Sequence, residues 1–180
     1  GNTNEGDITS SSNVQELYIG GIAAIWSNDC TKFENNEQCN ASEILSTGEP
    51  LKAYVGGIAG CVRGESVTID YTTNLLKSAG TIDVTDMVSD LTNGLLCIGG
   101  HFGYIEGDAT LNAPAWEGTI NSNFVDKDNY CPTKVGGIVA MVNGVTKITG
   151  ATVAGTLKTY HRWDTKASKQ VNHSMGGIVG

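Results

Sequence analysis

The residues best suited to chemistry in this chain lie together, in the segment Tyr160-His161-Arg162-Trp163. A histidine exchanges protons near neutral pH, a guanidinium binds acidic groups, and aromatic rings offer flat apolar faces to sugars. This combination is typical of sites that bind or process polysaccharides. A surface loop with one aromatic side chain packed against the protein body explains the same residues, so the sequence leaves both interpretations open.

Trp116 is a further candidate for ligand contact. It lies in the segment Ala113-Pro114-Ala115-Trp116-Glu117, just before an expected corner of the chain. This position predicts an indole at a loop surface, where it stacks on a sugar or on a partner protein. An aromatic residue that covers an edge of the fold is the equally weighted alternative.

Two acidic groups offer oxygen ligands for calcium. They are the segment Asp126-Lys127-Asp128-Asn129 and the spread Asp83, Asp86 and Asp90. Neither has the spacing of a calcium-binding loop, so solvated acidic surface is the preferred interpretation, and no cofactor is predicted. We expect His101 to be a buried histidine that bonds to the backbone rather than a metal ligand.

The cysteines show no metal-binding spacing. No two of the five form a Cys-x-x-Cys pair, which argues against a structural zinc site. Cys30 and Cys39 bracket a polar loop and are the candidate disulfide. Cys61, Cys97 and Cys131 lie beside strand-like runs and are expected to be buried as small apolar residues. Phosphate-binding loops, the His-Glu-x-x-His motif and the Gly-x-Ser-x-Gly motif are absent as well.

The elements that must position these residues are set by a repeat. A Gly-Gly pair followed by an apolar run occurs five times, and the first glycines are 36, 43, 37 and 40 residues apart. These pairs hold 10 of the 24 glycines. The structural glycines of the five pairs are Gly20, Gly21, Gly56, Gly57, Gly99, Gly100, Gly136, Gly137, Gly176 and Gly177.

Equivalent positions of the copies share their residue types. The residue after each pair is isoleucine in four copies and His101 in the third; a small residue follows two positions later, and an apolar residue two positions beyond that. Alternation predicts that these three positions line one inward face of a strand, with a bend or bulge at the glycines. Asn28, Gly64, Gly107 and Gly144 then predict one turn per repeat.

These columns predict an all-β fold, a parallel β-helix (β-solenoid) of about four repeats of 36–43 residues. Stacked coils would share one core of isoleucine and valine columns. Residues 1–17 are expected to form a flexible N-terminal segment or a cap, and residues 18–180 the solenoid. An antiparallel β-sandwich is the competing fold, but it does not need the same inward column at a near-constant period.

The repeat resembles the GLUG-type repeats of bacterial surface adhesins. The pattern Val55-Gly56-Gly57-Ile58-Ala59-Gly60, continued to Gly80-Thr81-Ile82, carries the resemblance, which also extends to Gly-Gly-Ile-Val-Gly β-helical repeats in secreted proteins of gut Bacteroidetes. It covers about residues 18–180, departs from the pattern at His101-Phe102, and identifies no active site. It implies an exported, cell-surface protein that serves in adhesion or as a structural module.

Composition excludes several partners. The formal net charge of −8 argues against binding to a nucleic-acid backbone or to an anionic membrane surface. No run of apolar residues is long enough to cross a membrane, so we expect no membrane insertion by this segment.

The function expected from the sequence is a non-enzymatic adhesion or recognition module, extracellular or at the cell surface. Its solenoid shaft would present variable loops, about residues 83–97, 121–134 and 158–174, to a glycan or protein ligand. A carbohydrate-active β-helix enzyme, a polysaccharide lyase or hydrolase, is the alternative, and a structural spacer of a larger surface protein is the third interpretation.

Overall fold

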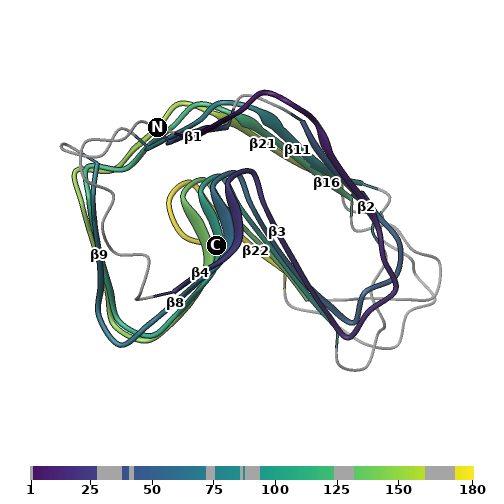
Figure 1. Cartoon of the computed structure of the whole chain (residues 1–180), viewed down its shortest axis with the longest axis horizontal. Coiled ribbons are helices and arrows are strands. Elements are labelled where there is room, and N and C mark those ends of the chain that lie inside the picture. Colours follow the sequence, from purple (N-terminus) through teal and green to yellow (C-terminus); the bar gives the residue numbers. More distant parts are fainter. Residues whose placement is uncertain are drawn as a thin grey trace.

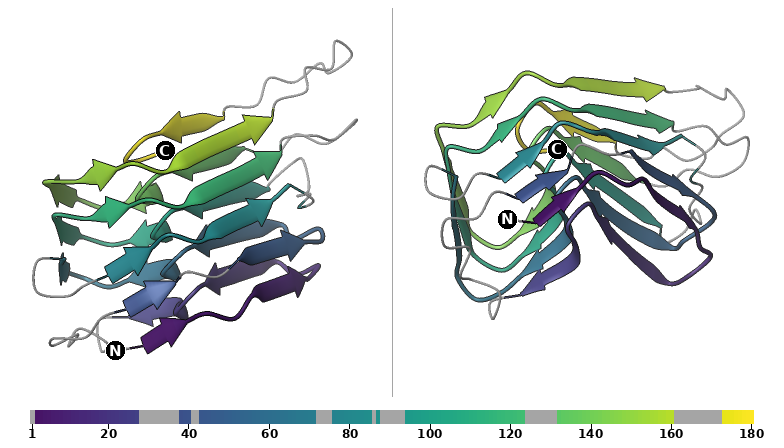
Figure 2. Two further views of the ribbon diagram at one scale, coloured as in Figure 1. Left: turned by 90° about the horizontal axis from the view of Figure 1, so that it is seen from above. Right: turned by 45° about the horizontal axis from the view of Figure 1, so that its top comes forward.

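The computed structural model describes residues 2–27, 38–40, 43–71, 76–85, 87, 94–123, 132–160 and 173–180. This part of the chain contains strands and turns and no helix, hence no helix that could cross a membrane. The strands follow one another around a coil, and each coil lies on the one before it (Figures 1 and 2). Every strand pairing is parallel and joins residues about one repeat apart, as expected for a β-solenoid. The fold predicted from the repeat is confirmed.

The coil has two five-stranded sheets, and we name each sheet after its first strand. The β2 sheet holds β2 (Ile8–Ser11), β6 (Ile44–Thr47), β11 (Thr81–Val84), β16 (Thr119–Asn123) and β21 (Thr156–Tyr160). The β3 sheet holds β3 (Glu16–Gly20), β7 (Lys52–Gly56), β12 (Leu95–Gly99), β17 (Thr133–Gly136) and β22 (Ser174–Gly176).

Four smaller sheets complete the coil. The β4 sheet holds β4 (Ala23–Ser27), β8 (Ala59–Arg63), β13 (Phe102–Glu106) and β18 (Val139–Asn143). The β9 sheet holds β9 (Val67–Asp70), β14 (Ala109–Asn112) and β19 (Thr146–Thr149). The β1 sheet holds β1 (Asn2–Asn4), β5 (Gln38–Asn40) and β10 (Leu76–Ser78), and β15 (Ala115–Trp116) pairs with β20 (Thr152–Val153).

The residues that follow the Gly-Gly pairs stack in one column, as predicted. The amide of Ile58 donates to the carbonyl of His101, and the amide of His101 donates to the carbonyl of Ile138, each at 3.0 Å. Ile22 and Ile178 continue this ladder at its two ends. Ile58 and Ile138 are fully buried, whereas Ile22 and Ile178 lie in the terminal coils and are partly exposed. Inward columns of the β2, β3, β4 and β9 sheets and of the β15–β20 pair merge into one apolar core.

Each Gly-Gly pair marks a sharp bend where the β3 sheet meets the β4 sheet inside the outline of the coil (Figure 1). The bend brings the second glycine of each pair close to the side of the coil that lies across the core from the bend. A Cβ added to Gly100 would lie 2.0 Å from the Gly137 carbonyl oxygen and 2.6 Å from the Trp116 ring. At Gly57 it would lie 1.9 Å from the Ser78 hydroxyl. Close approach of the two walls therefore explains why these positions are glycine.

The small residues two positions further along do not line the interior, so that part of the predicted inward face is wrong. A Cβ on Gly60 would meet the Ile19 amide nitrogen and the Tyr54 carbonyl oxygen, and one on Gly103 would meet the Val55 amide nitrogen. These positions thus face the neighbouring strand across the bend. They are small because the strand before the bend and the strand after it lie in close contact there. Val62 and the equivalent residues of the other coils point into the core again.

The turn predicted after each bend is confirmed at two of its four positions. Gly107 and Gly144 adopt φ angles of 106° and 142°, in the region that side chains other than glycine rarely adopt. Gly64 does not have a positive φ, and Asn28 lies outside the described residues.

The N-terminal segment is part of the solenoid. The β1 strand pairs with β5, β2 pairs with β6, and β3 crosses the expected boundary at residue 18. The side chains of Asp7 and Asn13 also accept hydrogen bonds from the amides of Glu43 and Glu49 in the next coil. Residues 2–17 therefore form the first coil rather than a flexible extension.

Candidate functional site

Most of the sequence-predicted ligand residues lie outside the described part of the chain. Tyr160 ends β21, but its side chain is not described, and His161, Arg162 and Trp163 follow in an undescribed segment. The disulfide expected between Cys30 and Cys39 also falls outside the described side chains. These predictions therefore remain untested.

Trp116 is described, and its predicted surface position is wrong. The indole is only 1% exposed. The short strand β15 explains this, because alternate residues point to opposite faces: Ala115 and Glu117 face solvent and Trp116 faces inward. Its ring lies where three glycines, Gly100, Gly118 and Gly155, leave room for it. Trp116 thus fills the narrow part of the coil and is not available for stacking on a sugar.

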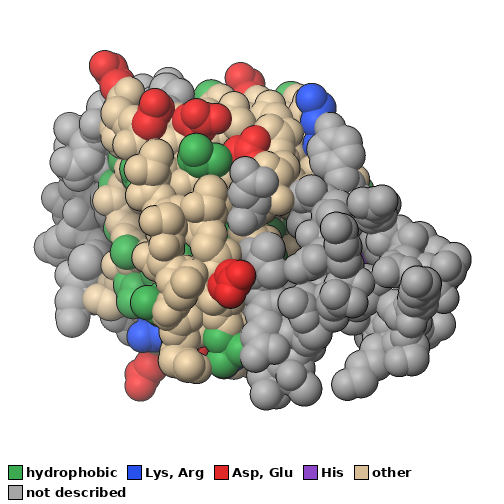
Figure 3. All heavy atoms as spheres, turned by 90° about the vertical axis from the view of Figure 1, so that its right-hand side faces the viewer, with side chains coloured by type: hydrophobic (Ala, Val, Ile, Leu, Met, Phe, Trp, Pro, Cys, Tyr) green, Lys and Arg blue, Asp and Glu red, His purple; other side chains and the backbone are tan. Residues whose placement is uncertain are grey.

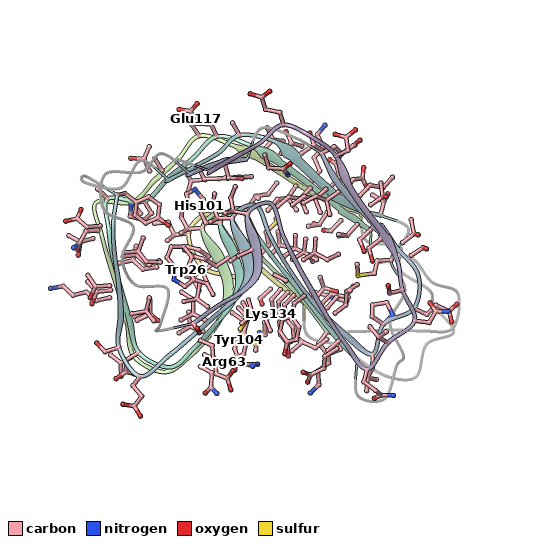
Figure 4. All side chains as sticks on the ribbon, in the orientation of Figure 1. Trp26, Arg63, His101, Tyr104, Glu117 and Lys134 are labelled. Carbon is pink, nitrogen blue, oxygen red and sulfur yellow. The ribbon has the colours of Figure 1, made fainter. Side chains whose placement is uncertain are left out.

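His101 is a buried histidine bonded to backbone, as the sequence predicts. Its Nε2 donates to the Ala115 carbonyl oxygen at 2.8 Å, so its Nδ1 accepts from the Tyr71 hydroxyl at 3.0 Å. Burial lowers the pKa of His101 to about 4 and raises that of Tyr71 well above its ordinary value. The imidazole is therefore neutral at pH 7, and it points into the interior (Figure 4).

The ends of the described strands define one edge of the solenoid where the chain passes from the β2 sheet to the β3 sheet. In the first two coils this passage is short, through residues 12–15 and 48–51. In the next three coils it is longer, through residues 85–94, 124–132 and 161–173. The strands that flank these connections are neighbours in both sheets. The three long connections therefore start from consecutive coils, which lie about 5 Å apart.

We call this edge the connection edge. Figure 3 views the molecule from this side, and the described surface there is mostly backbone and uncharged side chains, with acidic and hydrophobic side chains scattered among them and a few basic ones. In the third coil, Met87 forms a bridge with Gly48 and is buried, so the first long connection begins by packing over the second coil. The three sequence-predicted variable loops all include these connections.

A second surface feature is a stack of three tyrosines in the angle between the β3 and β4 sheets. Tyr18 and Tyr54, in consecutive coils, have ring centroids 5.1 Å apart and an interplanar angle of 16°. Tyr104 lies on the other side of Tyr54, also at 5.1 Å, with an angle of 24°. We call these three residues the tyrosine strip. Figure 4 shows Tyr104, Arg63 and Lys134 pointing into this angle.

The strip alternates large and small residues across the angle. Tyr54 lies two residues before its Gly-Gly pair, and the facing position of that coil is Cys61; in the next coil the order is reversed, with Cys97 and Tyr104. Both cysteines are buried, as predicted, and burial raises the pKa of Cys61 to about 11. The missed signal is the column two residues before each pair, which reads Tyr18, Tyr54, Cys97, Lys134 and Ser174.

Charged side chains cross the strip and join its two walls. The Tyr18 hydroxyl donates to Glu16 at 2.7 Å, and Glu16 also pairs with Lys52 at 3.4 Å. Arg63 donates to the Tyr18 hydroxyl at 3.3 Å and pairs with Glu106. The Tyr18 bond and Lys52 lower the pKa of Glu16; partial burial and the Glu16 bond raise that of Tyr18 to about 12.

The geometry indicates that the tyrosine strip stabilises the fold rather than binds a ligand. Both faces of the Tyr54 ring are covered by other tyrosines, and the Arg63 guanidinium lies 5.8 Å from the centroid of the Tyr18 ring. The pKa of Glu16 moves away from neutrality, as does that of Tyr18, so neither group is suited to proton transfer at pH 7. The strip therefore stabilises the bend.

We expect Arg63→Gln to lower the free energy of unfolding by less than about 1 kcal/mol, because both side chains of its ion pair with Glu106 are nearly half exposed. Urea unfolding at low and high salt measures the effect, which should shrink as salt screens the pair. Lys147→Gln, in the exposed face of β19, is the control. A salt-independent loss of several kcal/mol would contradict this account of the strip.

The calcium candidates are only partly described. Asp83 accepts hydrogen bonds from Thr85 and Asn121, which lower its pKa. Asp86, Asp90 and the segment 126–129 lie outside the described residues. Among the residues that the structure describes, no group of three or more histidine, cysteine or acidic side chains is placed to hold a metal ion.

Comparisons with known proteins give no relative from which to assign a role. No family model, no curated protein and no solved structure matches the chain.

Proposed function

We propose that this protein is a non-enzymatic adhesion or recognition module of the cell surface, with a β-solenoid shaft and a ligand-binding surface at the connection edge. The observation that carries the proposal is the placement of three long connections, residues 85–94, 124–132 and 161–173. They leave consecutive coils at one edge, while the strands on either side keep strict register. A rigid scaffold with several long connections at one edge is a usual arrangement of a recognition surface.

The chemistry of the described residues favours binding over catalysis. The histidine of the core is buried and neutral, and the ionisable groups of the tyrosine strip are tied to one another. The segment with His161, Arg162 and Trp163 joins β21 to β22, and these strands lie next to β16 and β17, which the preceding connection joins. A cationic and aromatic set of this kind suits an acidic or neutral glycan. The resemblance to surface adhesin repeats supports the same assignment.

The proposal is tested by shortening the connections while the shaft is kept. In one variant, residues 161–173 are replaced by the sequence of the short connection 48–51 from the same edge; in another, residues 124–132 are replaced in the same way. We expect both variants to retain the circular dichroism of the parent and to lose its binding on a glycan array or to immobilised matrix proteins. Thr68→Ala with Lys147→Ala, on exposed positions of the β9 sheet, is the matched control and should bind as the parent does.

Two results would overturn the proposal. If the shortened variants bind as well as the parent, the ligand does not contact the connection edge. If the parent cleaves a polysaccharide of the panel, and His161→Ala with Arg162→Ala abolishes cleavage, the protein is a carbohydrate-active enzyme. A parent that binds no member of either panel also counts against a recognition role and favours a structural spacer.

A further inference from the structure

The rings of Tyr18 and Tyr54 are held in contact by the pairing of their strands. The Cα atoms of these two residues are partners in the parallel ladder of β3 and β7, so both side chains leave the same face of the sheet. Their ring centroids lie 5.1 Å apart, and the ring planes differ by 16°. Tyrosines that are paired in register and stacked in this way have the ring carbons beside their hydroxyl groups close together. Coupling of two phenols through carbon requires this arrangement.

Tyr18 also has a base at its hydroxyl group. That hydroxyl donates to a Glu16 carboxylate oxygen at 2.7 Å. The bond from Tyr18 and the charge of Lys52 lower the pKa of Glu16, so the carboxylate is ionised at pH 7. A phenol that loses an electron becomes a strong acid, and its proton then passes to the oxygen that already accepts its hydrogen bond. Tyr104 differs, because its hydroxyl bonds to the side-chain amide of Asn143, which is not a base.

Tyr104 gives an oxidant access to the pair. It is partly exposed in the third coil, which has a coil on each side, and its ring centroid lies 5.1 Å from that of Tyr54. An electron therefore passes between the stacked rings over a short distance. Cys61, which faces Tyr54 across the angle, competes poorly for the oxidant. Burial raises the pKa of Cys61 to about 11, and the thiolate is the form that oxidants attack.

We propose that Tyr18 and Tyr54 form a site of oxidative cross-linking, where a one-electron oxidant joins two coils by a carbon–carbon bond. Two equivalents of the oxidant each take one electron, and each ring gives up its phenolic proton, that of Tyr18 to Glu16 and that of Tyr54 to water. The two phenoxyl radicals couple at ring carbons beside the oxygens. The hydrogens on these carbons then move to the oxygens, which restores both phenols.

A photoexcited ruthenium complex supplies the oxidant for the test, with persulfate as the final electron acceptor. After illumination, the monomer is isolated and digested with trypsin, which places Tyr18 in peptide 1–32 and Tyr54 in peptide 53–63. We expect mass spectrometry to find these two peptides joined, with the sum of their masses less two hydrogen atoms. The same reaction on the protein unfolded in urea should give little of this product, because the rings are then no longer held in contact.

Two phenylalanine variants assign the product to the tyrosine strip. Tyr54→Phe keeps an aromatic ring in the stack but has no phenol, so the joined peptides should disappear. Tyr71→Phe is the matched control, because Tyr71 is also buried but lies against His101 rather than against a tyrosine. It should give the yield of the parent. Circular dichroism checks that both variants are folded.

Glu16→Gln tests the proton acceptor, because glutamine keeps the size of the side chain but takes up no proton. We expect at least about tenfold less cross-linked product at pH 7. The yield of this variant should rise with pH, as hydroxide and buffer take over the role of the carboxylate. The yield of the parent should stay level between about pH 6 and pH 9, where Glu16 remains ionised.

The cross-link does not depend on the ligand-binding role proposed above, and it fails on results of its own. A folded parent without the joined peptides would overturn the proposal, as would an equal yield from the protein in urea. Oxidation that ends on Cys61, Cys97 or Met141 in place of the cross-link would overturn it as well. A Glu16→Gln variant with the parent's yield at every pH would exclude Glu16 as the proton acceptor.

Discussion

Gly100→Ala should strongly destabilise the protein. The added Cβ would lie 2.0 Å from the Gly137 carbonyl oxygen and 2.6 Å from two atoms of the Trp116 ring. The carbonyl belongs to the ladder between coils, and the buried indole has no free space to enter. Relief requires the bend and the opposite wall to separate. We expect a loss of about 3 kcal/mol or more in the free energy of unfolding.

Gly177→Ala is the matched control for this prediction. Gly177 is the second glycine of the fifth pair and occupies the same position of the repeat, but nothing lies within 4 Å of an added Cβ. We expect a change within about 0.5 kcal/mol, because only the contact with the next coil distinguishes the two sites. Chemical denaturation of both variants measures the difference. Equal losses would show that the glycines serve local backbone conformation instead of close packing between coils.

The contrast between these two glycines also shows what the sequence could predict. A repeat with one apolar column, one Gly-Gly pair and one turn is enough to predict stacked parallel coils, because identical columns have a use only when they stack. The path of the coil in cross-section was not predictable in this way. It depends on the bend bringing Gly57 against Ser78 and Gly100 against Trp116, and these contacts join residues whose spacing in the chain has no fixed period.

The candidate site was less predictable than the fold. Trp116 precedes a corner, which favours a surface position, but the pleat of a two-residue strand turns its ring inward. The tyrosine strip left a signal in the column before each glycine pair, yet the mixture of Tyr54, Cys97 and Lys134 has no meaning until the facing wall is known. The common edge of the variable segments, in contrast, follows directly from the predicted solenoid, because each segment joins the same two sheets.

His101 should make the stability of the protein depend on pH. Its pKa is about 4 in the folded protein and about 6.5 when the chain is unfolded, so between these values the unfolded state binds more protons. Its contribution is fully present above about pH 6.5 and is lost as the pH falls towards 4. The shift corresponds to about 3 kcal/mol. The cause is burial, because protonation would place a charge between Tyr71, Ala115 and the core.

Comparison with His101→Ile isolates this effect. Isoleucine is the residue of the other copies at this position, so the column is kept, while Tyr71 and Ala115 lose a partner at every pH. We expect the free energy of unfolding of the parent to fall between pH 7 and pH 4 by about 3 kcal/mol more than that of the variant. Carboxylates contribute equally to both proteins and cancel in the difference. Parallel pH profiles would mean that the imidazole is solvated or already charged in the folded state, and a buried neutral His101 would then be excluded.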